Sequence, residues 1–205
     1  MILAVDSSLP LFSVALVENG MAVAALLLEG RESRNEKLLP SIDWLFAESG
    51  SSRERLTLLV TTRGPGSFTG VRVGMATVSG LAMALAIPVC ALSTHEAMLA
   101  GASRDALVYN DAGRGEFYVS GFREGREVLA PALMGKDRLD ELRGEWDESI
   151  DIAVALKTQN PALNAALAAE KISARRDLDR YSDTSPIYVR LAEAEIRLRQ
   201  RDAAR

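Results

Sequence analysis

The chain has 205 residues and a formal net charge of −4, with 48% hydrophobic and 25% charged residues. These fractions are typical of globular domains and exclude a disordered chain, and the irregular spacing of 15 glycines and 7 prolines excludes a fibrous repeat. The negative charge argues against general nucleic-acid affinity, and we find no run of the roughly 18–20 apolar residues that a membrane helix needs.

The first residues of the chain have the pattern of strands. Residues 2–5 are apolar and end at Asp6, and residues 12–17 alternate as the two faces of a strand do. Asn19-Gly20 separates this run from residues 21–28, and the dipeptide tolerates the positive φ angles of a tight hairpin turn. The sequence therefore predicts a short strand followed by a β-hairpin.

A helix is expected after the hairpin. Ser33 and Glu36 have the capping-box spacing, and Pro40 falls near the first turns, where proline is tolerated. Apolar side chains then recur at helical spacing: Leu38, Leu39, Ile42, Leu45 and Phe46. We therefore expect an apolar-rich helix in this region.

A glycine-rich loop joins the next strand and helix. Residues 57–62 have the composition of a buried strand, and they lead into the loop Gly64–Gly70. Thr69 is expected to cap a helix that runs to about Ala86, because Pro88 cannot continue it. This strand–loop–helix unit is the most distinctive motif of the first half.

The second half of the chain repeats the pattern of the first. The remaining predicted elements are a strand over 87–92, a short helix opened by the capping box of Ser93 and Glu96, strands over 106–109, 116–122 and 127–133, a helix over 137–143, a strand over 151–156, a helix over 161–170 and a solvated helix over 191–200. At an offset of 105 residues, Asp6, Phe12, Val14 and Gly20 recur as Asp111, Phe117, Val119 and Gly125. We interpret this as two related α/β lobes, over residues 1–102 and 103–205.

Two segments of the first lobe have the composition of a phosphate site. The small residues after Asp6 let backbone amides approach an anion, and the glycine loop leads into a helix N-terminus, where free amides attract anions. The loop matches neither the P-loop nor the dinucleotide-binding pattern. The alternatives are an Asx turn between two strands and a tight strand-to-helix joint. The candidate residues are Asp6, Ser7, Gly64, Gly66, Ser67, Thr69 and Gly70.

The two helices of the first lobe have features of a protein–protein interface. The helix after the glycine loop is rich in Gly and Ala, which permit close approach, and the preceding helix has more apolar positions than one packing face requires. The helices contact either the protein's own sheet or a second polypeptide, and we favour the second. The candidate contacts are Leu38, Leu39, Ile42, Phe46, Val71, Met75, Val78 and Met83. Replacing Met75 or Val78 with Glu is then expected to abolish association and leave a folded monomer.

The usual catalytic groups are scarce. His95 is the only histidine, so a metal-binding histidine pair is excluded and a structural role is expected. Cys90, the only cysteine, lies in an apolar strand where a thiol is inert, and the lack of an internal disulfide is typical of cytoplasmic proteins. A cluster around one turn is expected to form ion pairs between the lobes: Asp111, Arg114 and Glu116. We expect no catalytic residue and no metal site.

Charge is unevenly distributed along the chain. Residues 171–205 contain nine basic and six acidic residues, a net charge of +3, which leaves −7 on the rest. A solvated helix explains this composition, and so does an arginine-rich tail that contacts RNA or an acidic partner. Both interpretations stay open.

Several motifs together resemble the TsaB (YeaZ) family. They are Asp6-Ser7-Ser8, Leu38-Leu39-Pro40, the loop Gly64–Gly70 with the following Val71-Arg72-Val73-Gly74, the segment Asp111–Tyr118, and Pro186–Arg190. The matches run from residue 2 to residue 190, nearly the whole chain. The resemblance implies an actin-like/Hsp70-like (ASKHA, ribonuclease H-like) α/β fold of two related lobes, in agreement with the internal repeat.

The resemblance also implies a function in RNA modification. Family members take part in forming N6-threonylcarbamoyladenosine at position 37 of tRNAs that read codons beginning with A. The larger homologue TsaD performs the transfer, so the implied role of this chain is that of a non-catalytic partner that stabilises and activates TsaD. The ATPase TsaE joins the complex, and without TsaD the chain forms a homodimer. The resemblance implies no cofactor of its own, ATP or ADP at the interface with TsaE, tRNA contact through the complex, and a cytoplasmic location away from membranes.

Carried over to this sequence, the family's interface falls on the two helices near residues 36–46 and 69–86. The chain departs from the family at Asn35, where relatives often have histidine, which puts a polar contact at the start of the first helix in doubt. The alternative function is a small ASKHA-type ATPase or kinase that acts alone, with Asp6 and the glycine loop around a Mg-nucleotide. The short lobes and the missing second phosphate loop argue against this alternative.

Overall fold

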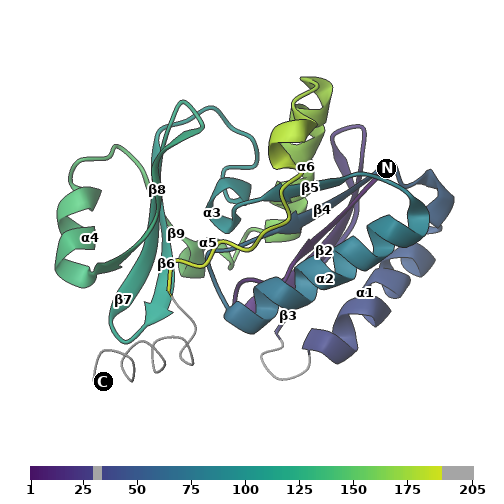
Figure 1. The fold of residues 1–205 in the computed structure, drawn as a ribbon, viewed down its shortest axis with the longest axis horizontal. Coiled ribbons are helices and arrows are strands. Elements are labelled where there is room, and N and C mark those ends of the chain that lie inside the picture. Colours follow the sequence, from purple (N-terminus) through teal and green to yellow (C-terminus); the bar gives the residue numbers. More distant parts are fainter. Residues whose placement is uncertain (30–33, 191–205) are drawn as a thin grey trace, which may run out of the picture.

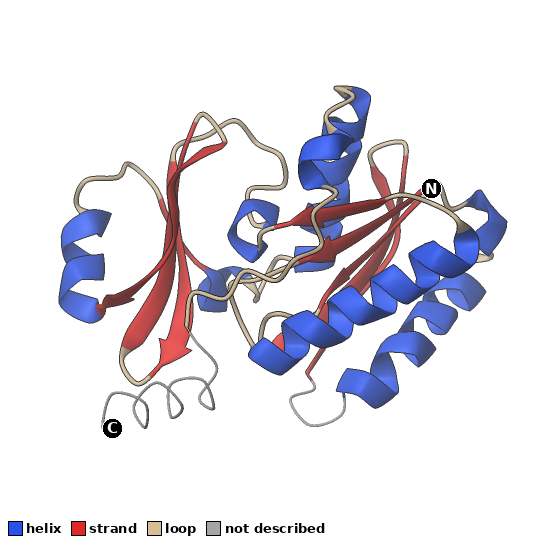
Figure 2. Ribbon diagram, viewed as in Figure 1, coloured by secondary structure: helices blue, strands red, loops and turns tan. Residues whose placement is uncertain are grey.

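The structure, a computed structural model, describes residues 1–29 and 34–190 and contains two β-sheets with helices packed against them (Figures 1 and 2). The first sheet has the strand order β3-β2-β1-β4-β5. Its strands are β1 (Ile2–Asp6), β2 (Leu11–Glu18), β3 (Met21–Glu29), β4 (Leu58–Thr62) and β5 (Val89–Leu92). The predicted hairpin is confirmed, because Asn19 and Gly20 connect β2 and β3 with φ angles of 52° and 74°.

The second sheet repeats the arrangement of the first, with the order β8-β7-β6-β9. Its strands are β6 (Ala106–Gly113), β7 (Glu116–Arg123), β8 (Arg126–Gly135) and β9 (Ser149–Asp151). In both sheets three antiparallel strands are followed by a strand parallel to the first of them. The repeated positions have equivalent places in the two sheets, although the registers differ by one residue: Asp6 pairs with Ser13, whereas Asp111 pairs with Phe117.

Helices cover both faces of the first sheet (Figure 1). The helices are α1 (Arg34–Ser49), α2 (Phe68–Leu85), α3 (Thr94–Ala97), α4 (Lys136–Arg143), α5 (Ile152–Ala155) and α6 (Pro161–Ala174), with short 3₁₀ turns η1 (Arg53–Arg55) and η2 (Leu178–Tyr181). Because successive strand residues point to opposite faces, Leu3 and Val5 pack toward α1 and α2, whereas Ile2 and Ala4 pack toward α6. The second half of the chain therefore supplies one layer of the first lobe.

Helix α6 fits against the sheet because its inner face consists of alanines. These are Ala162, Ala165, Ala166, Ala168 and Ala169, each no more than 2% exposed. Asn160 caps the helix by accepting a hydrogen bond from Leu163 N (2.9 Å), and Ser13 on β2 accepts one from Ala162 N (3.0 Å). These contacts fix the start of α6 against the middle of the first sheet.

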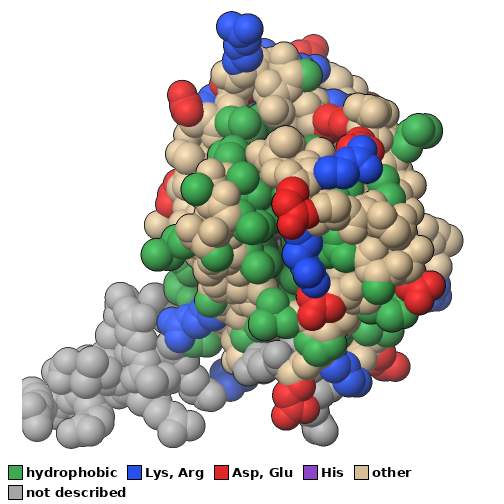
Figure 3. All heavy atoms as spheres, turned by 90° about the vertical axis from the view of Figure 1, so that its right-hand side faces the viewer, with side chains coloured by type: hydrophobic (Ala, Val, Ile, Leu, Met, Phe, Trp, Pro, Cys, Tyr) green, Lys and Arg blue, Asp and Glu red, His purple; other side chains and the backbone are tan. Residues whose placement is uncertain are grey.

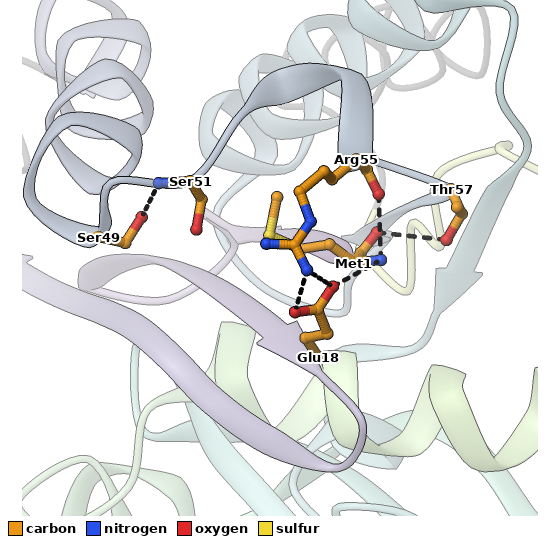
Figure 4. A network of polar contacts seen from close by, with 6 residues as sticks. All are labelled: Met1, Glu18, Ser49, Ser51, Arg55 and Thr57. Carbon is orange, nitrogen blue, oxygen red and sulfur yellow. Dashed lines mark hydrogen bonds and ion pairs between the residues drawn. The ribbon is translucent and has the colours of Figure 1, made fainter.

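A polar network anchors the N-terminus at the start of β1, the central strand of the first sheet (Figure 4). The Met1 ammonium group donates to Arg55 O (3.1 Å) and lies 3.9 Å from the Glu18 carboxylate. Arg55 Nη2 donates to both carboxylate oxygens of Glu18 (2.7 Å each), and Thr57 Oγ1 donates to Met1 O (3.3 Å). The network ties the start of β1 to the end of β2 and to the segment before β4.

Three local expectations differ from the structure. Helix α2 begins at Phe68 and is capped by Ser67, whose Oγ accepts from Gly70 N (3.2 Å), so Thr69 is not the cap. The predicted strand over 151–156 ends at Asp151, which caps the short helix α5. Pro40 lies inside α1, beyond its first turn. Ser33 of the first predicted capping box and the predicted helix over 191–200 lie outside the described residues.

Candidate functional site

The first candidate site lies where β1, β4 and β5 end. Asp6 is fully buried, and its Oδ1 atom accepts hydrogen bonds from Ser8 N (3.3 Å), Ser8 Oγ (2.6 Å) and Thr62 Oγ1. Ser8 Oγ in turn lies 2.8 Å from Thr94 Oγ1, at the start of α3. The Asp6 carboxylate thus organises the turn between β1 and β2 through the protein's own hydroxyl and amide groups.

The glycine loop lies directly against this turn. Ser67 N donates to Ser8 O (2.7 Å), and a Cβ atom at Gly66 would lie 2.2 Å from the same oxygen. One turn into α2, Ser7 Oγ donates to Gly70 O (2.6 Å), and a Cβ at Gly74 would lie 2.5 Å from Ser7 Oγ. The glycines are required because the loop and the turn touch backbone to backbone.

The candidate phosphate-site residues lie near one another in the structure, but not all of them take part in this contact. Four of the seven candidate phosphate-site residues make the contact between turn and loop, namely Ser7, Gly66, Ser67 and Gly70. Asp6 holds the turn itself, Gly64 packs against the C-terminal segment at Ile187, and Thr69 is exposed on α2. Because Gly66 and Ser8 are in direct contact, a phosphate group does not fit between them in this structure. Within the described residues, no group of three or more His, Cys, Asp or Glu side chains could hold a metal ion.

A C-terminal segment, residues 183–190, crosses from the first lobe to the second; we call it the C-terminal strap (Figure 1). At its start Asp183 forms an ion pair with Arg63 (3.1 Å), and Ile187 N donates to Arg63 O (2.7 Å). Gly64 has a φ of +96°, and a Cβ there would lie 2.9 Å from Ile187 O. The strap therefore packs directly on the glycine loop.

The strap contacts α2 of the first lobe through Tyr188 and reaches the second lobe through Arg190. Tyr188 stacks on Phe68 with ring centroids 4.9 Å apart, and its hydroxyl accepts from Arg72 Nε (2.7 Å). Arg190 donates to Ala112 O (2.8 Å) and forms an ion pair with Glu116 in the turn between β6 and β7. The Pro186–Arg190 motif was identified in the sequence only as a family resemblance. In the structure it connects the two lobes.

The expected ion-pair cluster of Asp111, Arg114 and Glu116 is therefore divided. Asp111 Oδ1 accepts from Gly113 N (2.7 Å) and shapes its own turn, and Arg114 occupies a left-handed position of that turn with a φ of 62°. Glu116 instead contacts Arg190 of the strap. The connection between lobes comes from the end of the described chain, which local spacing does not reveal.

His95 lies fully buried between the lobes. It sits on α3, its Nε2 lies 2.7 Å from Asn110 Oδ1, and its Nδ1 lies 2.7 Å from Ser120 Oγ. Because the amide oxygen of Asn110 only accepts, the proton is on Nε2 and Nδ1 accepts from Ser120. Burial lowers the pKa of His95 to about 4, and burial raises the pKa of Cys90 to about 12. The imidazole is therefore a neutral link between lobes, and the thiol is inert.

Most of the residues predicted to contact a partner from α1 and α2 are not on the surface. They are buried in the protein's own core, so this part of the prediction is wrong. Six are buried within this chain: Leu38, Ile42, Phe46, Val71, Met75 and Val78. Val78 is fully buried and Met75 is 6% exposed, so glutamate at either position meets the core rather than a partner. The expectation that Met75 and Val78 variants remain folded is therefore corrected.

The outer surfaces of the same two helices are nevertheless apolar. The exposed side chains are Leu39 and Trp44 on α1 and Met83 and Leu85 on α2, with exposures of 51%, 48%, 85% and 39%. Figure 3 views the molecule from the side on which these helices lie and shows hydrophobic side chains gathered in its left half. Two of the eight predicted contacts, Leu39 and Met83, belong to this surface. We call these four side chains the exposed helix face.

The sequence was expected to contain no segment with the length and composition of a membrane helix, and helix α2 contradicts this expectation. By these two criteria alone its 18 residues could cross a membrane, although the core helix of a soluble protein passes the same test. Only 28% of these residues are buried, although the helix packs on the sheet. Much of its apolar surface thus remains outside the core.

The fold and the comparisons identify the class. Two sheets that repeat the same order of strands define an α/β protein of the ASKHA type. Among solved structures, YeaZ from Pseudomonas aeruginosa superimposes with a TM-score of 0.70 and 24% identity, covering 91% of this chain and 98% of that chain. A second Pseudomonas aeruginosa structure, described as similar to peptidase YEAZ, gives a TM-score of 0.72 at 24% identity, covering 92% and 99%.

Sequence comparisons lead to the family. The family model described as "TsaD: tRNA N6-adenosine threonylcarbamoyltransferase" matches residues 31–183. The tRNA threonylcarbamoyladenosine biosynthesis protein TsaB of Escherichia coli (strain K12) is 36% identical over 160 residues, which are 71% of this chain and 68% of that protein. TsaB of Bacillus subtilis (strain 168) is 32% identical over 120 residues, 57% of this chain and 52% of that protein. The chain belongs to the TsaB (YeaZ) family.

Proposed function

We propose that this chain takes part in tRNA threonylcarbamoyladenosine biosynthesis as a non-catalytic partner of a TsaD homologue. In this proposal it stabilises and activates TsaD, with TsaE as a further subunit, and the product is N6-threonylcarbamoyladenosine at position 37 of tRNAs that read codons beginning with A. The names of the relatives support the pathway, and the match to a TsaD family model supports a shared ancestry with the proposed partner.

The exposed helix face carries the proposal of a protein partner. Large apolar side chains that are exposed on two neighbouring helices have a free-energy cost in water that a second helical surface removes. Met83 is 85% exposed near the end of α2, and small residues of this helix are exposed as well, at Ala76, Gly80 and Ala84, beside the larger Leu85 and Arg72. Such a surface permits close approach of another helix, because small side chains keep the backbones near one another.

The state of the candidate chemical groups supports a non-catalytic role. Asp6 Oδ1 accepts hydrogen bonds from Ser8 and Thr62, and the contact of Gly66 with Ser8 leaves no room for a phosphate group between them. His95 is buried and neutral, and the Cys90 thiol is protonated at physiological pH. An ATPase or kinase acting alone needs an open crevice, so calorimetry with Mg-ATP on the isolated chain is expected to show no tight binding and no turnover.

The association test uses exposed side chains that leave the core intact. Met83→Glu and Trp44→Glu each place a charge where the partner's apolar surface is expected, and we expect affinity for the cognate TsaD homologue to fall by about 100-fold or more. The matched control is Val128→Glu on β8 of the second lobe, where the side chain is 60% exposed. Association is measured by calorimetry or co-elution, and circular dichroism verifies that each variant is folded.

The functional test reconstitutes the reaction. The chain alone is expected to transfer nothing, whereas addition to its cognate TsaD and TsaE homologues with threonylcarbamoyl-AMP and tRNA restores modification. Met83→Glu should reduce product in proportion to lost association, and Val128→Glu should behave as the native chain. Full modification in the absence of this chain, or undiminished association of both helix-face variants, contradicts the proposal.

A further inference from the structure

A cavity lies between the lobes, and no residue of α1 or α2 lines it. It has a volume of about 950 Å³ and is bounded by the segment linking the two sheets, the turn between β7 and β8, α6 and the C-terminal strap. Its walls are close-packed: a Cβ at Gly125 would lie 2.7 Å from Ala102 O, and one at Gly101 would lie 2.9 Å from Lys171 Cδ. The cavity is therefore built into the junction, and its volume lies within the range of small-molecule sites.

Two carboxyl groups from different lobes line this cavity. Glu96 comes from α3, where its Oε1 accepts a hydrogen bond from Tyr181 Oη (2.8 Å), and Glu127 comes from β8. Burial raises the pKa of both groups, and the charge of Glu96 raises the pKa of Glu127 further. The two carboxylates thus repel one another, the nearby Arg63 guanidinium offsets part of that repulsion, and a further cation between them removes the rest.

Cationic groups line the cavity as well, and part of their bonding capacity is free. Lys171 Nζ on α6 donates to two carbonyls, Ala100 O (3.0 Å) and Gly101 O (3.3 Å). Arg175, one turn further along α6, forms no ion pair with any residue in the described ranges 1–29 and 34–190. The Nε atom of Arg63 is buried and has no hydrogen-bond partner within those same ranges. Lys171 on α6 and Arg175 at its C-cap lie together, so an anionic group is expected to bind on the α6 side, whereas Arg63 acts on Glu96 and Glu127.

We propose that this cavity binds a small zwitterion, an α-amino acid, with its ammonium group between Glu96 and Glu127 and its carboxylate toward Lys171 and Arg175. A ligand with a single charge satisfies only one of the two sets of groups. Because the cavity takes no residue from α1 or α2, this proposal stands or fails independently of the partner proposal.

The test measures binding to the full chain by calorimetry, with thermal unfolding as a second readout. The probes are glycine and L-glutamine, two zwitterions of different size, and the matched single-charge probes are acetate and ethylammonium. We expect at least one zwitterion to bind in the millimolar range or tighter and to raise the unfolding temperature. Each single-charge probe should bind about tenfold more weakly or not at all, because it lacks one of the two contacts.

Variants locate the binding. Glu127→Gln preserves shape and removes one carboxylate charge, and Arg175→Gln removes one cation; each should weaken zwitterion binding about tenfold or more. The control is Arg176→Gln, a neighbouring exposed arginine that does not line the cavity. The proposal is overturned if neither zwitterion binds, if acetate or ethylammonium binds as tightly, or if all three variants bind alike.

Discussion

Acid destabilisation through His95 is the most quantitative expectation from the structure. The imidazole is fully buried on α3 and links the first lobe to Asn110 and Ser120 of the second sheet in its neutral form. Protonation of the folded protein places an uncompensated charge in the interior, whereas protonation of the unfolded chain is unhindered. Acid therefore favours the unfolded state through this one group.

The size of the effect follows from the two pKa values. His95 has a pKa of about 4 in the folded protein, where burial lowers it from the ordinary value of about 6.5. Between these values the unfolded state binds more protons, so stability rises with pH across this window and is constant with respect to this group above it. The full difference corresponds to about 3 kcal/mol, lost as pH falls from 6.5 toward 4.

The assay compares the native chain with His95→Gln by urea unfolding at several pH values from 7.5 to about 4.5. Carboxyl groups titrate in both proteins, so the difference between the two pH profiles isolates the imidazole. Because the chain has one histidine, its NMR titration is assigned without ambiguity and measures the pKa even if the variant fails to fold. A titration midpoint near 6.5, or parallel pH profiles for the two proteins, would refute the reasoning.

Three further perturbations follow from packing. Gly66→Ala places a methyl group 2.2 Å from Ser8 O and should cost at least about 2 kcal/mol in chemical denaturation, whereas Gly80→Ala, in open space on α2, should be neutral or stabilise by up to about 1 kcal/mol. Arg190→Gln should release the end of the C-terminal strap and speed its amide exchange about tenfold or more; unchanged exchange contradicts the assigned role. Val78→Glu should unfold the protein, as judged by lost circular dichroism, and a native spectrum contradicts the assigned burial.

Local chemistry made much of the fold predictable. Asn19-Gly20 specifies its hairpin turn through positive φ angles, and the capping hydroxyl of Ser93 accepts from Glu96 N (2.9 Å) as its spacing predicts. The repeat of Asp6 at Asp111 anticipated two sheets of equal design. These signals act within a few residues or recur at a fixed offset, so they are readable before any tertiary contact is known.

The face on which α2 packs was not predictable in the same way. The helix is apolar or small on most sides, so periodicity does not distinguish the residues that meet the sheet from those that meet a partner. Val78 and Met83 are both plausible contacts in sequence, but one is fully buried and the other 85% exposed. Gly74 determines which side of α2 faces the sheet, because its lack of a side chain lets the helix lie against Ser7 and so fixes the rotation of the helix about its axis.

Contacts between segments that are distant along the chain could not be predicted from the sequence either. The strap residue Ile187 lies against Gly64, and the alanines of α6 lie against strands more than a hundred residues earlier. Spacing within one segment carries no information about which distant surface completes it. For the same reason the sequence grouped Asp6, Ser7 and the glycine loop as one candidate site but did not show that Gly66 lies directly against Ser8.

The contribution of α6 to the first lobe has a consequence for biosynthesis. While the chain is still being translated, β1 through β5 can pair, yet one side of that sheet, including Ala4 and Val60, stays uncovered until α6 has left the ribosome. The first hundred residues are thus expected to remain incomplete and dependent on chaperones during elongation. Cooperative folding of the first lobe then begins only after α6 has been synthesised.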